Sequence, residues 1–180
     1  APAGARLLDH PLLLVCTHGK RDACCARLGL KLHAALEAEV PAEWLWQVSH
    51  IGGHRFAGNV VWLPEGIYLG RVAPEDAAAV AAAVRARRIP LAHARGRAAL
   101  PPPAQAADLA LRARLGLDGA GDVVLAAPPE PAADGGAGFR VRLSAAGTEH
   151  AIDVRPVALP PAVVSCGNDP EPQTRMVAVL

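Results

Sequence analysis

Two loops that carry sulfur and nitrogen donors constrain this chain more than any other feature. The first loop runs from Cys16 to Cys25, and the second contains His50 and His54, which are separated by one isoleucine and two glycines. A glycine can take positive φ and adds no side chain, so a tight turn can direct both histidine rings to one point. Each loop directly follows a segment typical of a strand. Strands of one sheet would bring both loops to one edge. Two cysteines of the first loop and the two histidines of the second therefore form a predicted metal site, whose sulfur and nitrogen donors suit zinc or iron–sulfur chemistry.

The pattern of apolar residues around the two loops predicts an α/β fold. Leu28, Leu32 and Leu36 follow helical spacing, whereas the segments before the two loops are short and apolar or alternating. The predicted elements are strand 12–15, helix 24–40, strands 44–48, 59–63 and 67–72, of which the last two form a hairpin, and helix 74–88. A strand, a crossover helix and a strand, followed by a hairpin and a helix, indicate a thioredoxin-like layout with a mixed sheet.

A run of three prolines, 101–103, predicts a boundary in the second half of the chain. Beyond it we expect a helix at 104–117 and three short strands at 123–126, 139–143 and 150–157. The residues 128–138, between the first two of these strands, are expected to form an exposed loop. We therefore predict two domains. Residues 7–97 form a thioredoxin-like domain, and residues 98–180 form a small α+β C-terminal extension.

Composition and charge exclude several classes of function. The chain has 18 Lys and Arg against 17 Asp and Glu, and no basic run interleaved with aromatic residues, so we expect no nucleic-acid partner. No segment approaches the ~18 apolar residues that a membrane span needs. Aromatic residues are 3% of the chain, so Trp44, Trp46 and Trp62 are the expected large pieces of a Leu-, Val- and Ala-rich core. The four cysteines are not evenly spread as in a secreted disulfide scaffold, which predicts a reducing, cytoplasmic location.

Two runs of residues resemble the sucrase/ferredoxin-like family. They are Cys16-Thr17-His18-Gly19-Lys20-Arg21-Asp22-Ala23-Cys24-Cys25 and Ser49-His50-Ile51-Gly52-Gly53-His54-Arg55-Phe56-Ala57-Gly58-Asn59, within a resemblance that covers roughly residues 7–95. The resemblance implies a thioredoxin-like ferredoxin domain with a [2Fe–2S] cluster. Members of the family are often longer, with a further cysteine-containing N-terminal region, so this chain is compatible with a fragment or a short variant.

The resemblance also implies the cluster ligands, which would be Cys16, Cys25, His50 and His54. In thioredoxin-like ferredoxins with four cysteine ligands, the last two ligands are separated by three residues, as the two histidines are here. Cys25 is preferred to Cys24 because it precedes a short segment that ends in glycine, as the second ligand does in those relatives. Cys24 is then expected to be a neighbouring buried thiol, and His18 remains an alternative ligand. Rieske proteins mix one cysteine and one histidine in each loop, so this site would not be a Rieske site.

These observations favour an electron carrier over an enzyme. Neutral imidazole in place of thiolate raises the reduction potential of a cluster, and an imidazole can couple electron transfer to protonation. Lys20, Arg21 and Arg55 lie next to the ligand loops, where they either dock an acidic redox partner or are solvated loop charges. The partner would be a reductase or an electron acceptor of unknown identity, and the oligomeric state, including a homodimer, stays open.

Two other functions are possible for the residues of these two loops. A structural zinc ion accepts two cysteine and two histidine ligands. A metal-free thiol redox protein would use Cys16 or the pair Cys24 and Cys25, although the Cys-x-x-Cys motif of such enzymes is absent from this chain. The segment Cys166-Gly167 is either a redox thiol or part of a packing turn, and the packing turn is the expected one.

Overall fold

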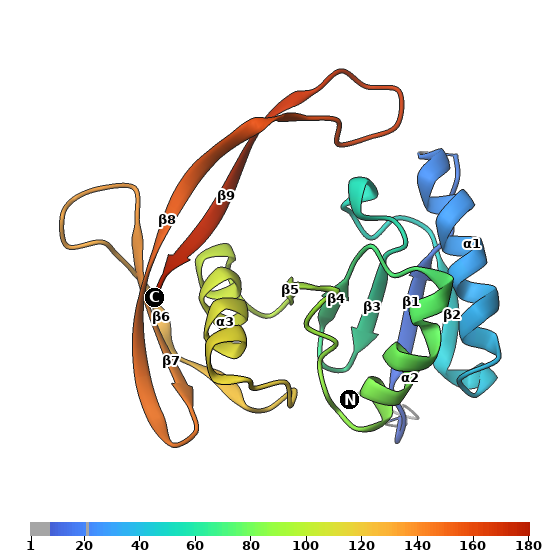
Figure 1. Ribbon diagram of the computed structural model, residues 1–180, viewed down its shortest axis with the longest axis horizontal. Coiled ribbons are helices and arrows are strands. Elements are labelled where there is room, and N and C mark those ends of the chain that lie inside the picture. Colours follow the sequence, from blue (N-terminus) through green and yellow to red (C-terminus); the bar gives the residue numbers. More distant parts are fainter. Residues whose placement is uncertain (1–7, 21) are drawn as a thin grey trace, which may run out of the picture.

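A computed structural model describes residues 8–20 and 22–180 and places them in two lobes, each with its own sheet (Figure 1). The sheet of the N-terminal lobe has the strand order β2-β1-β3-β4-β5. β1 pairs in parallel with β2, whereas the β1–β3, β3–β4 and β4–β5 pairs are antiparallel. The strands are β1 (Leu12–Cys16), β2 (Leu45–Val48), β3 (Val60–Leu63), β4 (Ile67–Leu69) and β5 (Ala94–Arg97).

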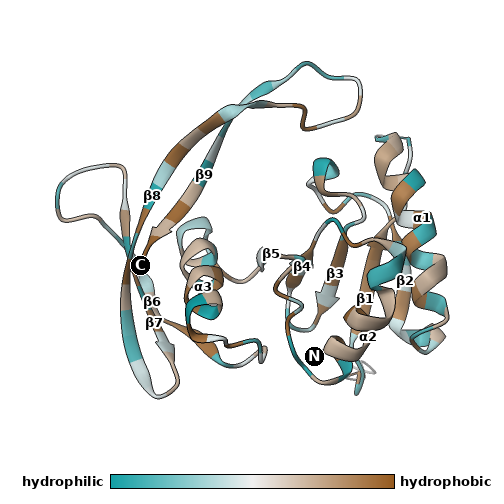
Figure 2. Cartoon of the chain, in the orientation of Figure 1, coloured by the Kyte–Doolittle hydropathy of each residue, from teal (hydrophilic) through white to brown (hydrophobic). Residues whose placement is uncertain are grey.

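Two helices pack on this sheet, α1 (Ala23–Glu37) against β1 and β2, and α2 (Ala77–Arg85) against α1. Asp22 is the N-cap of α1, and its side chain accepts a hydrogen bond from the backbone N–H of Cys24. One stripe of α1 is buried in the core, formed by Cys25, Gly29, Leu32, His33 and Leu36. Short 3₁₀ turns precede β2, β3 and α2, at Ala42–Trp44, His54–Phe56 and Pro74–Asp76. Figure 2 shows hydrophobic residues along the strands and polar residues on the outer turns of α1.

The C-terminal lobe consists of an antiparallel sheet, in the order β6-β7-β8-β9, and the helix α3 packed on it. Its elements are α3 (Pro102–Leu115), β6 (Val123–Pro131), β7 (Phe139–Ala145), β8 (Thr148–Ala162) and β9 (Glu171–Val179). β8 and β9 form a long two-stranded ribbon that arches from this lobe back towards the N-terminal end of α1 (Figure 1). We call the loop that joins them, residues 163–170, the strap.

The mixed sheet with α1 as the crossover between β1 and β2 confirms the predicted thioredoxin-like layout and the α/β fold class. Several details of the prediction were wrong. Leu28 lies on the exposed side of α1, because the buried stripe is centred nearer Gly29, and Trp46 is 56% exposed on the edge strand β2. β5 and β9 were not predicted, and β6 extends through residues 128–131, which were predicted to be part of a loop.

The buried apolar clusters are two, one in each lobe. Ala120 follows α3 in the sequence but packs with the cluster of the N-terminal lobe. The predicted division of the chain between residues 97 and 98 stays a prediction, and residue 7 lies outside the described residues. Among the helices of the part that the structure describes, none is long and apolar enough to cross a membrane.

Candidate metal centre

Cys16 ends β1 and lies where the sheet meets both loops. Its backbone N–H donates to the carbonyl of Asn59 at 3.1 Å, and its buried thiol donates to the carbonyl of Ser49 at 2.9 Å. Ser49 directly precedes His50 in the sequence. The parallel pairing of β1 with β2 therefore brings the first cysteine beside the start of the histidine loop, as the strand-end argument predicts.

Cys25 lies in the first turn of α1 and is 1% exposed. Its sulfur lies 3.5 Å from Nδ1 of His54. Burial, the hydrogen bond and charge of Cys16, and the negative charge of Asp22 together raise the pKa of the Cys25 thiol to about 12. In the metal-free protein this thiol is therefore protonated at neutral pH, and a metal that binds it must displace the proton.

The histidine loop turns on its two glycines. Gly52 and Gly53 have φ values of 80° and 67°, which is the left-handed region that the sequence predicts for this turn. The rings of His50 and His54 stack with their centroids 4.5 Å apart. Since His54 also lies 3.5 Å from the sulfur of Cys25, the loop places one imidazole beside a buried thiol and the second imidazole against the first.

The buried carboxylate of Asp22, the N-cap of α1, also lies beside His54, and sequence analysis did not single it out. Its Oδ2 lies 3.8 Å from Nδ1 of His54 and accepts hydrogen bonds from the hydroxyl of Ser165 at 2.8 Å and the N–H of Cys166 at 2.9 Å. Burial acts to raise the pKa of Asp22, but these hydrogen bonds and the one from the Cys24 N–H outweigh it and lower the pKa. The signal that could have located it is the preference for aspartate as a helix N-cap.

Arg95 of β5 supports the histidine loop from the other side. Its guanidinium donates to Oδ1 of Asn59 at 3.2 Å, and Nδ2 of Asn59 donates to the carbonyl of Gly53 at 3.0 Å. A Cβ atom on Gly53 would lie 2.5 Å from Nη1 of Arg95, so the loop and the guanidinium are in close contact. Burial and the positive charges of Arg55 and Arg71 lower the pKa of Arg95.

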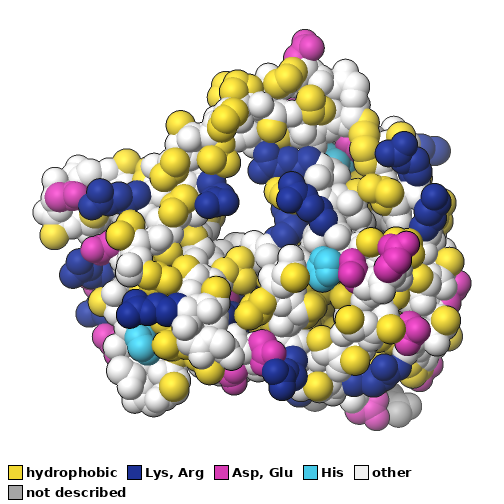
Figure 3. All heavy atoms as spheres, in the orientation of Figure 1, with side chains coloured by type: hydrophobic (Ala, Val, Ile, Leu, Met, Phe, Trp, Pro, Cys, Tyr) yellow, Lys and Arg dark blue, Asp and Glu magenta, His cyan; other side chains and the backbone are white. Residues whose placement is uncertain are grey.

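Three guanidiniums surround the ring of Phe56, those of Arg55, Arg71 and Arg95, at 4.7, 5.1 and 4.1 Å from its centroid. Among the described residues, none of the three forms a salt bridge with a carboxylate. Figure 3 shows Lys and Arg side chains gathered around the hollow between the ribbon of β8 and β9 and the N-terminal lobe. The histidine loop therefore carries positive charge on its outer side.

The remaining residues singled out by the sequence lie away from the four donors or have other partners. Cys24 forms a disulfide with Cys166, so the expectations of a buried free thiol and of a simple packing turn were both wrong. His18 makes no hydrogen bond or ion pair with any residue that the structure describes. Lys20 is exposed, and Arg21 lies outside the described residues.

The spread of the donors tests which metal group they fit. Four ligands of one tetrahedral zinc ion lie about 3.3–3.8 Å from one another, given zinc–ligand bonds of about 2.0–2.3 Å. Among the described residues, the donor atoms of Asp22, Cys24 and Cys166 all lie within 4.8 Å of one another, but the two sulfurs of this group are bonded to each other. No three of the four predicted ligands have donor atoms that lie this close together. Ligands of two different irons lie farther apart than ligands of one ion. The four predicted ligands are therefore not set around one ion in this structure, while thiolate and imidazole are the ligand types that hold [2Fe–2S] clusters.

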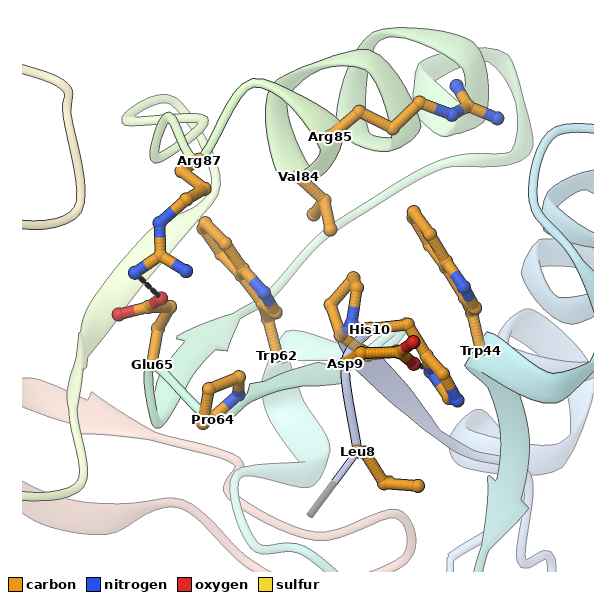
Figure 4. A pocket seen from close by; sticks show the side chains of 11 residues that line it. Leu8, Asp9, His10, Trp44, Trp62, Pro64, Glu65, Val84, Arg85 and Arg87 are labelled. Atoms are coloured by element: carbon orange, nitrogen blue, oxygen red, sulfur yellow. Dashed lines mark hydrogen bonds and ion pairs between the residues drawn. The ribbon is translucent and has the colours of Figure 1, made fainter.

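A cavity of about 330 Å³ lies at the opposite end of β1 from Cys16 (Figure 4). Trp44, Trp62 and the ion pair between Glu65 and Arg87 line it, and none of the four predicted ligands does. This cavity is therefore separate from the candidate metal centre.

A family model described as sucrase/ferredoxin-like matches residues 5–96, just over half of the chain. Altered inheritance of mitochondria protein 32 from Meyerozyma guilliermondii is 39% identical over 74 residues, which are 36% of this chain and 26% of that protein. The protein of the same name from Saccharomyces cerevisiae is 51% identical over 51 residues, 27% of this chain and 16% of that protein.

The chain thus matches about a quarter or less of the length of these two relatives. Among solved structures, a thioredoxin-like [2Fe–2S] ferredoxin from Aquifex aeolicus aligns with a TM-score of 0.46 and 14% identity, over 52% of this chain and 97% of that one.

Proposed function

Because this chain belongs to the sucrase/ferredoxin-like family, we propose that it is an electron carrier that binds one [2Fe–2S] cluster through Cys16, Cys25, His50 and His54. One observation carries the proposal, which is that Sγ of the buried Cys25 lies 3.5 Å from Nδ1 of His54, whose ring stacks on that of His50. When bound, such a cluster supplies one-electron redox chemistry. Proton coupling stays a prediction from the histidine ligands.

The protein's own residues provide the remaining requirements of an electron carrier. The core packing of β1 and α1 fixes the two thiols, and the turn at Gly52 and Gly53 fixes the imidazoles, so few groups need to move when the charge of the site changes. Asp22 faces His54 with an ionised carboxylate, whereas Arg95 places a positive charge behind the same loop. These groups set the electrostatic surroundings of the site before any metal binds.

We further propose that the arginines around Phe56 dock an acidic redox partner. They lie directly beside the His54 turn and form no salt bridge within the described part of the chain. Arg71 is exposed and stacks on Phe56, so its side chain is available to a partner. Positive charge on a docking face accelerates association with a negatively charged partner.

The first experiment is the visible absorption and reduced-state EPR spectrum of anaerobically prepared protein, together with iron and sulfide analysis, for wild type and His54→Cys. We expect two irons and two sulfides per chain in both. His54→Cys adds a thiolate, whose negative charge stabilises the oxidised cluster, so its potential should fall by roughly 100 mV or more. The EPR signal should shift towards that of a cluster with cysteine ligands.

Other results would contradict the proposal in distinct ways. One zinc per chain without sulfide would establish the structural zinc site, and its removal should then unfold the lobe. A protein that binds no metal would leave the thiol redox function. Unchanged potential and EPR spectra in His54→Cys would show that His54 is not a ligand.

The docking proposal has its own test with small redox reagents. Arg71→Glu should slow oxidation of the reduced protein by ferricyanide, an anion, by about an order of magnitude at low ionic strength, and high salt should remove the difference. A cationic cobalt complex should show the opposite trend. Arg114→Glu, which changes an exposed residue of α3, is the matched control and should change neither rate. Equal rates for Arg71→Glu and Arg114→Glu with both reagents would place the docking face elsewhere.

A further inference from the structure

The strap is covalently tied to the metal centre. Cys166 in the strap forms a disulfide with Cys24 of α1, 142 residues away in the sequence. Cys24 directly precedes the proposed ligand Cys25. The disulfide thus joins the tip of a ribbon from the C-terminal lobe to the first turn of the helix that carries a ligand.

Among the described residues, hydrogen bonds also link the strap and β9 to the N-terminal lobe. Asp22 accepts the hydrogen bonds from Ser165 and Cys166, and Arg55 donates to Oε1 of Gln173 at 2.6 Å. The main contacts of β8 and β9 are with each other, with β7 and with α3, all within the C-terminal lobe. Loss of the disulfide would therefore leave hydrogen bonds, rather than a covalent bond, between the strap and the start of α1.

The disulfide is also open to attack from one side. Cys166 is exposed and Cys24 is half-buried, so an incoming thiolate reaches the sulfur of Cys166 more easily. In a reducing compartment, which the cysteine usage predicts, disulfides are usually transient and serve catalysis or redox sensing. An exposed sulfur that can be attacked, at Cys166, and a half-buried sulfur that leaves as the thiolate, at Cys24, are properties of an exchangeable disulfide rather than of a buried structural one.

We propose that Cys24–Cys166 is a thiol–disulfide exchange site for a protein dithiol of the thioredoxin class, and that its reduction releases the strap from the metal centre. A thiolate of the dithiol attacks Cys166 Sγ, the bond between the two cysteine sulfurs breaks, and Cys24 leaves as a thiolate that takes up a proton. The second thiol of the reductant then resolves the mixed disulfide and releases Cys166 as a thiol. Two electrons and two protons pass to this chain, and the dithiol becomes a disulfide.

Release of the strap changes the surroundings of the candidate metal centre. Asp22 loses the donors from Ser165 and Cys166, which now supply two of its hydrogen bonds, and its face towards His54 gains access to water. The effect on a bound cluster rests on the proposed function, whereas the exchange reaction and the movement of the strap do not.

The test follows the disulfide and the strap separately in the full chain. Air-oxidised protein is treated without denaturant with thioredoxin, thioredoxin reductase and NADPH, then quenched, alkylated and mapped by mass spectrometry, with fragment ions that distinguish Cys24 from Cys25. We expect a Cys24–Cys166 cross-linked peptide before treatment and alkylation of both cysteines after it. Hydrogen–deuterium exchange of residues 163–170 should become at least severalfold faster on reduction.

Variants separate the covalent bond from the polar contacts. Cys166→Ser and Cys24→Ser should show the fast strap exchange without any reductant, whereas Ser165→Ala keeps the disulfide and should change the exchange only slightly. Free Cys24 and Cys166 in the oxidised protein, a disulfide that thioredoxin reduces only after unfolding, or an unchanged strap in the reduced protein would each overturn the proposal. Iron and sulfide analysis of the same samples keeps this outcome distinct from failure of the cluster proposal.

Discussion

Cys25→Ser is expected to lose its bound iron, whereas Cys24→Ser should retain it. Cys25 is buried against Cys16 and His54, while Cys24 points to the strap and bonds Cys166. Successive helical residues project about 100° apart, so the two adjacent sulfurs cannot serve the same site. Serine keeps the size of the side chain but removes the sulfur ligand. Iron affinity should fall by at least the roughly 10- to 100-fold that loss of a supporting residue costs a metal site.

The measurement is iron and sulfide per folded chain, with visible absorption, for both variants and for wild type. Circular dichroism checks that each variant is folded. A cluster that survives in Cys25→Ser and disappears in Cys24→Ser would exchange the roles of the two cysteines. Cys24→Ser also frees the strap. A partial loss of iron in that variant is therefore compared with the iron content of Cys166→Ser, which frees the strap without changing a residue of α1.

The sequence could predict the convergence of the two loops because it follows from local pattern. Apolar segments before each loop predict strands, and the ends of neighbouring parallel strands meet at one edge of a sheet. The turn at Gly52 and Gly53 was predictable for the same reason, since it needs only positive φ. The mixed sheet and its crossover helix were therefore available from periodicity and turn residues alone.

Contacts between distant segments could not be predicted in this way. Nothing near Cys166 indicates a partner 142 residues away, and the strands of the ribbon contain prolines that argue against long strands. Arg95 was also missed, because β5 is short and its support of the histidine loop runs through Asn59. Asp22 could have been noticed as a helix N-cap, but its second role depends on Ser165 and Cys166 in the strap.

Gly29 shows how a residue that looks unfavourable in the sequence is required by packing. Glycine inside a helix costs about 0.5–1 kcal/mol relative to alanine, so propensity alone predicts that Gly29→Ala stabilises α1. In the structure, a Cβ atom at this position would lie 2.0 Å from the carbonyl oxygen and 3.0 Å from the carbonyl carbon of Cys16. Both are backbone atoms of the interior strand β1, so no flexible side chain can move aside. The close approach of helix and strand therefore depends on glycine.

We expect Gly29→Ala to lower the free energy of unfolding by about 3 kcal/mol, at the upper end of the usual cost of overpacking. The melting temperature should fall by roughly 6–12 °C for a chain of this size. Because α1 must move away from β1, Cys25 and Cys16 separate, and bound iron should fall with stability. Leu30→Ala is the matched control, since Leu30 lies on the same helix and is 49% exposed. If the two variants melt at the same temperature and hold equal iron, the contact between α1 and the Cys16 carbonyl does not set the geometry of the thiols.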